Sequence, residues 1–450
     1  MARRVSVPVK KLEERVKNFG EVVTGYPLQL AVAEASRCLL CYDAPCIKGC
    51  PAKIDIPIFI RRIKTKDIRG SINVIRQNNV LPGICARVCP VEKLCEKYCC
   101  SKELTEPINI GALQRFAADF EKERGIKPSR LEITGKKVAV VGSGPAGLAA
   151  AFELIRMGHR VTIFEAKSLL GGMLAYGIPP YRLPKEAVRA EVDYIKRTGI
   201  TINTNKPVKK IDELFDEGFD AIFIGIGTTQ PVFLNLPDEN LEGVYLGMEF
   251  LKKVNEVEVG KQEPFSLLGK KVAVIGGGNV AIDASRCCSR LGAEKVYVVY
   301  RRSLEEMPAY KSEVAAARYE GVEFMILSTP TKILGNGNVV GLECIRMKLG
   351  EADESGRRKP IPIPGSEFKF DVDLVIEAIG QKVDEKFIKD NPHVKVSNGL
   401  IVVDKETGMT SYQGVFAGGD VINGGTTVVQ AVAEGTLAAK GIDKYLKGDN

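Results

Sequence analysis

The sequence contains no tryptophan and only two histidines among 450 residues. So few imidazole groups argue against a histidine-centred metal site and against a catalytic triad, because both need histidine at defined positions. Long apolar runs are also missing, and none reaches the roughly 20 residues that a membrane-spanning helix requires. The N-terminal stretch MARRVSVPVKKLEERVKNF has basic residues but no apolar core behind them, which is not the pattern of a signal peptide. We therefore expect a cytoplasmic protein.

Charge of one sign is not concentrated anywhere in the chain. The 64 basic residues are interspersed with 56 acidic ones, so the net charge of +8 comes without a dense basic block. This balance favours a mixed, solvated surface over a nucleic-acid interface. Hydrophobic residues at 45% and charged residues at 27% are typical of a globular protein, and the length suggests about three domains.

Cysteine is abundant but unevenly placed, since nine of the twelve cysteines lie between Cys38 and Cys100. They form two sets, which read Cys38-x2-Cys41-x4-Cys46-x3-Cys50-Pro and Cys85-x3-Cys89-Pro-x4-Cys95-x3-Cys99-Cys100. Short spacing lets several thiolates converge on one soft metal centre. Disulfides are one alternative, but a reducing cytoplasm disfavours them. Zinc is a stronger alternative, although it usually takes two separated Cys-x2-Cys pairs and only one is present. The pattern favours two iron–sulfur clusters, which need eight ligands.

After Cys100 the pattern changes to short β-branched runs that end in glycine and are followed by helix-like segments. This alternation predicts α/β layers with parallel sheets. Two strand–helix–strand units stand out, one beginning at KKVAVVG (136–142) and one at KKVAVIG (270–276). A segment at 102–135, with a helix in IGALQRFAADFEKERG, is expected to link the cysteine region to the first unit. The polar, proline-rich stretch at 350–365 is expected to be an exposed loop.

The first unit carries the glycine pattern of a dinucleotide site. Gly142 permits the tight turn after the strand, Gly144 lets a pyrophosphate approach the backbone, and Gly147 allows the helix to pack closely on the strand. The helix N-terminus offers free N–H groups to the phosphates. Glu165 ends the following strand, where a carboxylate can bind ribose hydroxyls. The unit predicts a dinucleotide site.

The second unit repeats the arrangement at Gly276–Ala281, but its second strand ends in Arg301 and Arg302 instead of an acid. Guanidinium groups at this position suit the 2′-phosphate of NADP(H), which a carboxylate would repel. The alternative is that both arginines belong to a solvated strand end. We expect NADPH here in preference to NADH.

Taken together, six motifs of the chain resemble those of a known family. They are the cysteine region, GSGPAG, GGMLAYGIPPYRLPKE (171–186), GGGNVAID, YRRSLEEMP and AGGD. The family includes the NADPH-dependent glutamate synthase small subunit, the large subunit of ferredoxin:NADP oxidoreductase (sulfide dehydrogenase), and the N-terminal half of dihydropyrimidine dehydrogenase. The likeness runs from about residue 18 to the C-terminus. It implies an α/β fold with an N-terminal α-helical iron–sulfur domain and two Rossmann-like domains, the NADP domain being inserted in the FAD domain. The expected boundaries are 1–130, 131–233, 234–375 and 376–450.

The resemblance also implies the cofactors and their ligands. One [4Fe-4S] cluster would be held by Cys38, Cys41, Cys46 and Cys99, and a second by Cys50, Cys89, Cys95 and Gln114. Cys85 and Cys100 would not be ligands. The residues expected to contact FAD are Ser143, Gly144, Pro145, Ala146, Gly147, Glu165, Gly172, Met173, Arg182, Val208, Gly419 and Asp420. The residues expected to contact NADPH are Gly277, Gly278, Asn279, Val280, Arg301, Arg302 and Gly380.

The expected activity is electron transfer, in which NADPH reduces FAD and the clusters carry single electrons onward. No side-chain acid or base is required, so we name no catalytic residue. A partner that accepts electrons is implied, and three remain open: the glutamate synthase large subunit, a ferredoxin-linked flavoprotein with possible bifurcation at FAD, and a pyrimidine-reducing FMN subunit. A regulatory redox sensor that binds nucleotide without turnover is the alternative from another class.

Overall fold

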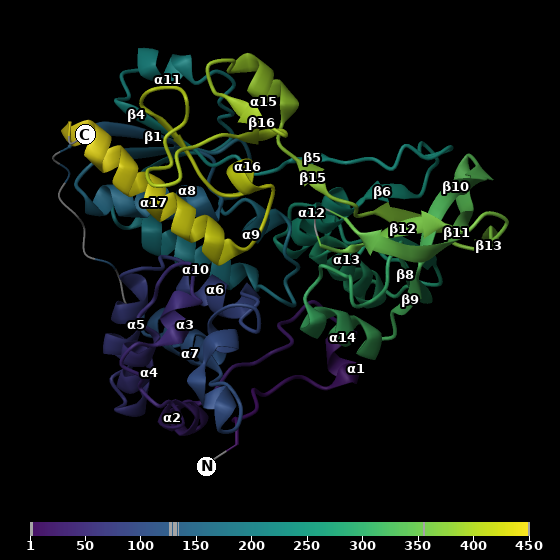
Figure 1. Cartoon of the computed structure of the whole chain (residues 1–450), viewed down its shortest axis with the longest axis horizontal. Helices are drawn as coiled ribbons and strands as arrows, with labels where there is room; N and C mark the ends of the chain where they lie inside the picture. The colour runs from purple at the N-terminus through teal and green to yellow at the C-terminus, as the bar shows by residue number, and fades with distance from the viewer. Residues whose placement is uncertain (1–2, 126–127, 129–132, 134, 354–355, 449–450) are drawn as a thin grey trace.

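The computed structural model describes residues 3–125, 128, 133, 135–353 and 356–448, and it has three parts (Figure 1). A helical part built from the N-terminal quarter of the chain lies below two parts that each contain a parallel sheet. The α-helical plus α/β class expected from the sequence is therefore confirmed.

Short helices build the N-terminal part, and two of them are fixed by aspartate caps. Asp55 accepts a hydrogen bond from the backbone N–H of Ile58, and Asp67 accepts one from that of Gly70. The last helix, α7, was expected to lie in a linker, but it packs against α2, α5 and α6 and so belongs to this part. The helices are α1 (Leu12–Arg15), α2 (Leu28–Ser36), α3 (Pro45–Lys48), α4 (Ile56–Lys64), α5 (Ile68–Arg76), α6 (Pro82–Val88), η1 (Cys95–Tyr98), η2 (Cys100–Glu103) and α7 (Ile110–Glu123).

The first parallel sheet has the strand order β18-β4-β1-β2-β3. Its central strands are buried because helices cover both faces, as their continuous apolar sequences predict. The long helix α17 lies against α8 (Figure 1). The elements are β1 (Lys137–Val141), α8 (Pro145–Arg156), β2 (Arg160–Phe164), α9 (Met173–Tyr176), α10 (Lys185–Lys196), β3 (Thr201–Asn203), α11 (Asp212–Asp216), β4 (Ala221–Ile224), α15 (Glu385–Asp390), β16 (Val396–Ser397), β17 (Leu400–Ile401), β18 (Val415–Ala417), α16 (Asp420–Asn423) and α17 (Val428–Lys447).

The second parallel sheet has the order β6-β14-β7-β8-β9. Strand β14 stays in register with β7 through the pair Glu377 and Ile275, so this sheet continues two residues past the expected boundary at 375. The chain crosses between the two sheets at an antiparallel pair, β5 with β15. The elements are β5 (Gln230–Pro231), β6 (Val244–Leu246), α12 (Gly247–Glu258), β7 (Lys271–Ile275), α13 (Asn279–Arg290), β8 (Lys295–Tyr300), α14 (Lys311–Tyr319), β9 (Glu323–Ile326), β14 (Leu374–Glu377) and β15 (Gln381–Lys382).

An antiparallel sheet extends from the second parallel sheet. It contains β10 (Ser328–Asn336), β11 (Asn338–Ala352), β12 (Arg358–Pro362) and β13 (Phe368–Phe370). Strand β12 lies inside the stretch that we expected to be a loop, so that expectation is wrong for these residues. Its prolines are compatible with a strand because β12 pairs only with β11, which leaves one edge free of ladder hydrogen bonds.

Within the described ranges, no helix has the length and apolar composition needed to cross a membrane.

Candidate functional site

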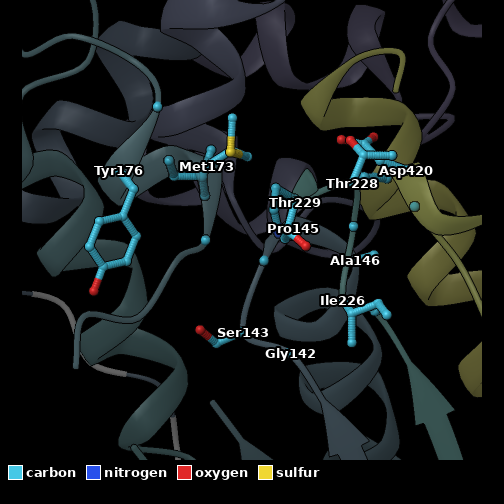
Figure 2. A pocket seen from close by; sticks show the side chains of 18 of the residues that line it. Gly142, Ser143, Pro145, Ala146, Met173, Tyr176, Ile226, Thr228, Thr229 and Asp420 are labelled. Atoms are coloured by element: carbon cyan, nitrogen blue, oxygen red, sulfur yellow. The ribbon is translucent and has the colours of Figure 1, made fainter. Parts of the chain in front are cut away.

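A cavity of about 570 Å³ lies where the three parts of the fold meet. The turn between β1 and α8 forms one wall, and α9 and the start of α17 face it (Figure 2). Asn279 and Val280, at the start of α13, close the cavity from the second sheet, and Val88 reaches it from the helical part. The largest part of the predicted site is therefore brought together around one cavity.

The turn between β1 and α8 has the geometry of a phosphate cradle. Gly142 has φ +99°, and a Cβ there would lie 2.5 Å from the carbonyl oxygen of Gly225. A Cβ on Gly147 would lie 2.0 Å from the carbonyl oxygen of Gly142, so Gly147 serves packing and does not line the cavity. At Gly144 the nearest protein atom would be 4.0 Å away. The backbone is thus open where a pyrophosphate must approach, and the residues fit the dinucleotide.

Glu165 lines the same cavity at the end of β2. Its carboxylate accepts hydrogen bonds from the backbone N–H of Ser143 at 3.0 Å, from the Ser143 hydroxyl at 2.5 Å, and from the backbone N–H of Lys167 at 2.8 Å. These bonds fix the acidic group beside the glycine turn, at the place where a ribose would follow the pyrophosphate.

Other residues expected at FAD lie beside this turn, because a Cβ on Gly172 would be 3.1 Å from Gly144 and one on Gly419 would be 2.9 Å from Ala146. Gly172, Met173 and Val208 line the cavity, as do Gly419 and Asp420. Figure 2 shows Asp420 above the turn that holds Pro145 and Ala146. Burial raises the pKa of the Asp420 carboxyl, while a hydrogen bond from the backbone of Thr426 opposes the shift. The first turn of α17 reaches the cavity through Val428 and Ala431, so its positive end faces the expected position of the flavin.

Arg182 lines the cavity but already has a partner in the second α/β part. Its guanidinium lies 2.6 Å and 2.8 Å from the two carboxylate oxygens of Asp283 on α13. The preceding residue, Tyr181, is buried, and the guanidinium groups of Arg286 and Arg290 lie 4.5 Å and 3.9 Å from the centre of its ring. The segment that we expected to contact FAD therefore also joins the two α/β parts.

The second glycine turn is divided between two environments. A Cβ on Gly277 would lie 2.3 Å from the ring of Tyr300, so Gly277 serves packing, whereas no protein atom lies within 4 Å of one on Gly278. Asn279 and Val280 line the cavity, and Gly380 does not. Gly380 has φ +135° and lies immediately before β15.

The two arginines after β8 differ from one another. Arg301 is exposed, whereas Arg302 is buried and donates to Asp353 at 2.6 Å and to the carbonyl oxygen of Arg358 at 2.8 Å. Asp353 directly follows β11, and Arg358 is the first residue of β12. Arg301 is therefore the one of the pair whose guanidinium faces solvent.

The first group of cysteines gathers Cys38, Cys41, Cys46 and Cys99. Burial raises the pKa of the Cys46 thiol to about 12, and the nearby thiols of Cys99, Cys38 and Cys41 add to the shift. Cys100 hydrogen-bonds to Cys41 and so stands at the edge of this group. The expected set is close together, with one additional cysteine beside it.

The second group contains Cys50, Cys85, Cys89 and Cys95. A hydrogen bond between the Cys89 and Cys85 thiols raises the pKa of Cys89, followed by burial and the nearby thiols, those of Cys95 and Cys50 among them. Cys85, expected to be a bystander, therefore lies in contact with this group.

Gln114, the expected fourth ligand, is buried on α7, and its Nε2 donates to the carbonyl oxygen of Pro82 at 2.9 Å. In the described part of the chain, no three His, Cys, Asp or Glu side chains converge tightly enough to hold a single metal ion. Both cysteine groups are thus gathered, but more widely than around one ion.

The groups are ordered with respect to the cavity. Val88 lines the cavity and precedes Cys89 of the second group. Cys95 of the second group is in electrostatic contact with Cys46 of the first. The spatial order is therefore the cavity, then the second cysteine group, then the first cysteine group, and it leads through the helical part toward the protein surface.

Sequence reasoning missed several residues that line the cavity. Thr228 and Thr229 follow β4, and Asp384 and Phe387 come from α15 and the residue before it. Thr228 and Thr229 could have been found, because carboxyl ends of parallel strands meet at one edge of a sheet. The α15 residues carry no such signal in the sequence.

Comparison with known proteins agrees with this geometry. Residues 136–435 match the family described as pyridine nucleotide-disulphide oxidoreductase. Residues 15–126 match the family described as dihydropyrimidine dehydrogenase domain II, 4Fe-4S cluster.

Among similar proteins, the NADP(+)-dependent formate dehydrogenase subunit beta of Moorella thermoacetica is 43% identical, over 90% of this chain and 60% of that protein. The NADPH-Fe(3+) oxidoreductase subunit beta of Geobacter sulfurreducens (strain PCA) is 39% identical, over 96% of this chain and 68% of that protein. The glutamate synthase (NADPH) small chain of Escherichia coli K12 is 36% identical, over 99% of this chain and 98% of that protein.

Solved structures share the fold of the nucleotide-binding parts. Mycobacterium tuberculosis FprA in complex with NADPH has a TM-score of 0.58 at 19% identity, over 70% of this chain and 85% of that one. Lactococcus lactis thioredoxin reductase has a TM-score of 0.54 at 21% identity, over 70% of this chain and 99% of that one.

Proposed function

Because this chain belongs to the pyridine nucleotide-disulphide oxidoreductase family and has a 4Fe-4S domain of the dihydropyrimidine dehydrogenase type, we propose that it takes electrons from NADPH and passes them to a partner subunit. The observation that supports this proposal is a single cavity, which is lined by the first glycine turn and by the start of α13 after the second one, and which Val88 connects to the cysteine groups. The chain is an oxidoreductase subunit of the glutamate synthase small-chain type, with which it aligns almost end to end.

Bound FAD would supply the chemistry that one-electron clusters lack, because a flavin takes up two electrons together and releases them one at a time. The chain itself binds and orients. Gly144 and the start of α8 receive the pyrophosphate, and Glu165 receives a ribose. Gly278 and Asn279 play the corresponding part for NADPH, and Arg301 binds its 2′-phosphate.

We assign two [4Fe-4S] clusters to the two cysteine groups. Cys38, Cys41, Cys46 and Cys99 hold the first. Cys50, Cys89 and Cys95 hold the second, with Gln114 as the fourth ligand and Cys85 beside it. Such thiols need a compartment that keeps them reduced, which supports a cytoplasmic location.

Two kinds of electron-accepting protein are candidates for the partner subunit. Nearly complete coverage of the E. coli small chain favours a glutamate synthase large subunit. The higher identity to the formate dehydrogenase and ferric reductase beta subunits favours another flavoprotein or metalloprotein complex as the second candidate.

The test is anaerobic purification followed by metal, flavin and activity measurements. We expect about eight irons and one FAD per chain, and NADPH oxidation with a small artificial acceptor such as ferricyanide. Zinc in place of iron, or nucleotide binding without turnover, would contradict the proposal. Adding a purified glutamate synthase large subunit should then give NADPH-dependent glutamate formation if the first candidate is correct.

A further inference from the structure

Two buried side chains hold the short helix α9, which forms part of the cavity wall (Figure 2). Leu174, Tyr176 and Ile178, in α9 and the turn after it, all line the cavity. A helix of four residues leaves most of its carbonyl groups without a partner inside the helix. The carbonyl oxygens of these three residues accept hydrogen bonds from the side chains of Lys185 and Asn255.

Lys185, the first residue of α10, binds this wall from the first α/β part. Its ammonium donates to the carbonyl oxygen of Ile178 at 2.7 Å and to that of Leu174 at 3.2 Å. The residue is only 4% exposed, and it is not among the described residues that line the cavity. A buried amino group is costly unless its N–H groups are hydrogen-bonded, so the place of Lys185 is tied to these two carbonyl groups.

Asn255, on α12, binds the same wall from the second α/β part. Its Nδ2 donates to the carbonyl oxygen of Tyr176 at 2.9 Å and to that of Leu251, one turn earlier in its own helix, also at 2.9 Å. Asn255 is 1% exposed, and its Oδ1 has no hydrogen-bond partner in the described part of the chain. An unpaired buried oxygen is unfavourable, and a leucine would avoid it. The contribution of the amide therefore lies in its bond to Tyr176.

The turn after α9 also packs closely on α12. A Cβ on Gly177 would lie 3.1 Å from the Cε of Met248, which lines the cavity on α12, and 2.7 Å from the Cε of Met173. Little space therefore separates α9 from the second α/β part. Lys185 and Asn255 thus hold one short wall between the parts that carry the first and the second glycine turn.

We propose that Lys185 and Asn255 are positioning residues that hold α9 from both α/β parts and so keep the flavin and NADPH sites in register for hydride transfer. The proposal rests on the function above. In that reaction one hydride leaves NADPH, which becomes NADP+, and its two electrons pass to FAD, while neither side chain gains or loses a bond. Hydride transfer needs the reacting atoms in close, aligned contact, and a displacement of about 1 Å can slow such a step about 100-fold.

The charge of Lys185 gives this arrangement a pH dependence. Burial lowers the pKa of Lys185 to about 7, and the groups that face it oppose this shift: Cys287 and Asp283 from α13, Glu258 from α12 and Glu186 from α10 itself. The ammonium is therefore present below pH 7 and lost above it. A neutral amine donates more weakly to carbonyl groups than an ammonium does. We expect the wall to be held less firmly as the pH rises through 7.

The test uses the holoprotein, with NADPH as the reductant. Lys185→Met keeps the apolar stem and removes the donor, and Asn255→Leu keeps the shape and removes the amide. Stopped-flow absorbance gives the rate of flavin reduction at saturating NADPH and, from its concentration dependence, the Kd for NADPH. We expect flavin reduction at least tenfold slower in each variant with the Kd for NADPH unchanged within twofold, because neither side chain lines the cavity.

Two further readouts separate positioning from a general loss of packing. If both side chains hold the same wall, the double variant Lys185→Met, Asn255→Leu should be slowed by less than the product of the two single effects. Ultrafiltration of the holoprotein gives the Kd for FAD without turnover. This Kd should rise at least fivefold between pH 6 and pH 8.5 in the unmodified protein and stay constant over the same range in Lys185→Met.

The matched control is Lys196→Met, on the same helix, whose side chain is 47% exposed and lies 3.8 Å from Asp193. It should match the unmodified protein in every readout. Flavin reduction within twofold of this control in both single variants, or a double variant slowed by the full product, overturns the proposal. Where Lys185→Met does not retain FAD, the rate in Asn255→Leu decides it. Absence of flavin reduction by NADPH in the unmodified protein would instead contradict the proposed function, and the pH dependence of the Kd for FAD would still decide the role of Lys185.

Discussion

Two adjacent arginines show how neighbours in sequence take different roles. Arg301 is exposed, whereas Arg302 is buried against Asp353 and the backbone of Arg358. From the sequence pattern, both arginines were expected to bind the 2′-phosphate. The structure distinguishes them because the connection from β11 to the start of β12 supplies Arg302 with partners that lie 51 and 56 residues further along the chain.

We predict that Arg301→Ala raises the KM for NADPH about tenfold and leaves that for NADH nearly unchanged, since only NADPH carries the phosphate. Arg302→Ala should instead lower the free energy of unfolding by about 1–3 kcal/mol, because it removes a buried charged hydrogen bond. Steady-state kinetics with both nucleotides and thermal unfolding of both variants measure the difference. An equal loss of NADH use in Arg301→Ala would show that Arg301 acts on the shared part of the nucleotide.

The second prediction concerns the fourth ligand of the inner cysteine group. Gln114→Ala should make that cluster labile, and Gln114→Glu should keep it at a lower potential, because a carboxylate adds one negative charge. Cys85→Ser should leave iron content and potential almost unchanged. Iron analysis and redox titration of the three variants are the measurements. Loss of iron in Cys85→Ser with normal iron in Gln114→Ala would transfer the ligand role to Cys85.

At the scale of elements, the end of strand β14 connects the second parallel sheet to the β5–β15 pair, where the chain crosses between the two α/β parts. Glu377 is its last residue, and the chain then leads through Gly380 into β15. The Glu377 side chain is buried and accepts from the backbone N–H of Leu234, which follows β5. Burial raises its pKa to about 7, and the charge of Glu239 and a hydrogen bond with that carboxyl add to the shift. Glu377 is therefore a protonated acid at the crossing between the two α/β parts in mildly acidic solution.

This arrangement predicts a pH dependence of stability. The pKa rises from 4.5 to about 7 on folding, so between these values the unfolded state loses its proton first. The stabilisation from Glu377 is complete below pH 4.5 and is lost as the pH rises through 7. Glu377→Gln removes this titration. The free energy of unfolding of Glu377→Gln minus that of the unmodified protein should therefore be about 1–2 kcal/mol larger at pH 8 than at pH 5. Thermal unfolding across this range measures it. The exposed control Glu294→Gln should show no such trend, and parallel pH profiles for Glu377→Gln would contradict the prediction.

At the scale of the whole molecule, buried ion pairs hold the three parts together. Arg76 on α5 pairs with Glu121 on α7 and with Glu191 on α10, the latter at 2.8 Å. Glu191 also accepts from the backbone N–H of Gly83 at 2.7 Å. The ring of Tyr194 lies 3.7 Å from the Arg76 guanidinium. The helical part is thus fixed to the first α/β part at the side where α6 carries Val88 to the cavity.

Arg76→Leu should destabilise the protein by roughly 3–5 kcal/mol, because two buried carboxylates lose their partner. The expected result in urea is earlier separation of the helical part, seen as loss of the iron–sulfur absorption before loss of the flavin signal. The control Arg156→Leu changes a more exposed arginine on α8 and should cost less than about 1 kcal/mol. A single coincident transition at the unmodified midpoint would show that the pair contributes little to the junction.

The sequence by itself determined those elements whose residue pattern is contained within about 30 residues of chain. The two glycine turns with their strands and helix α7 follow from period and spacing, since such contacts form between near neighbours. The grouping of Cys99 with Cys38 and of Cys50 with Cys89, which are far apart in the chain, was instead implied by the family resemblance. Arg182 was placed at the cavity, but its partner Asp283 was not expected, since it lies in the other α/β part.

Only the tertiary structure decided which distant groups meet. It brought Cys85 near Cys50, paired Arg302 with Asp353 and added Phe387 to the cavity. These outcomes depend on how sheets and helices pack across long stretches of chain. A side chain's type states what it can bind, whereas its partner and its exposure are fixed by the elements that fold against it.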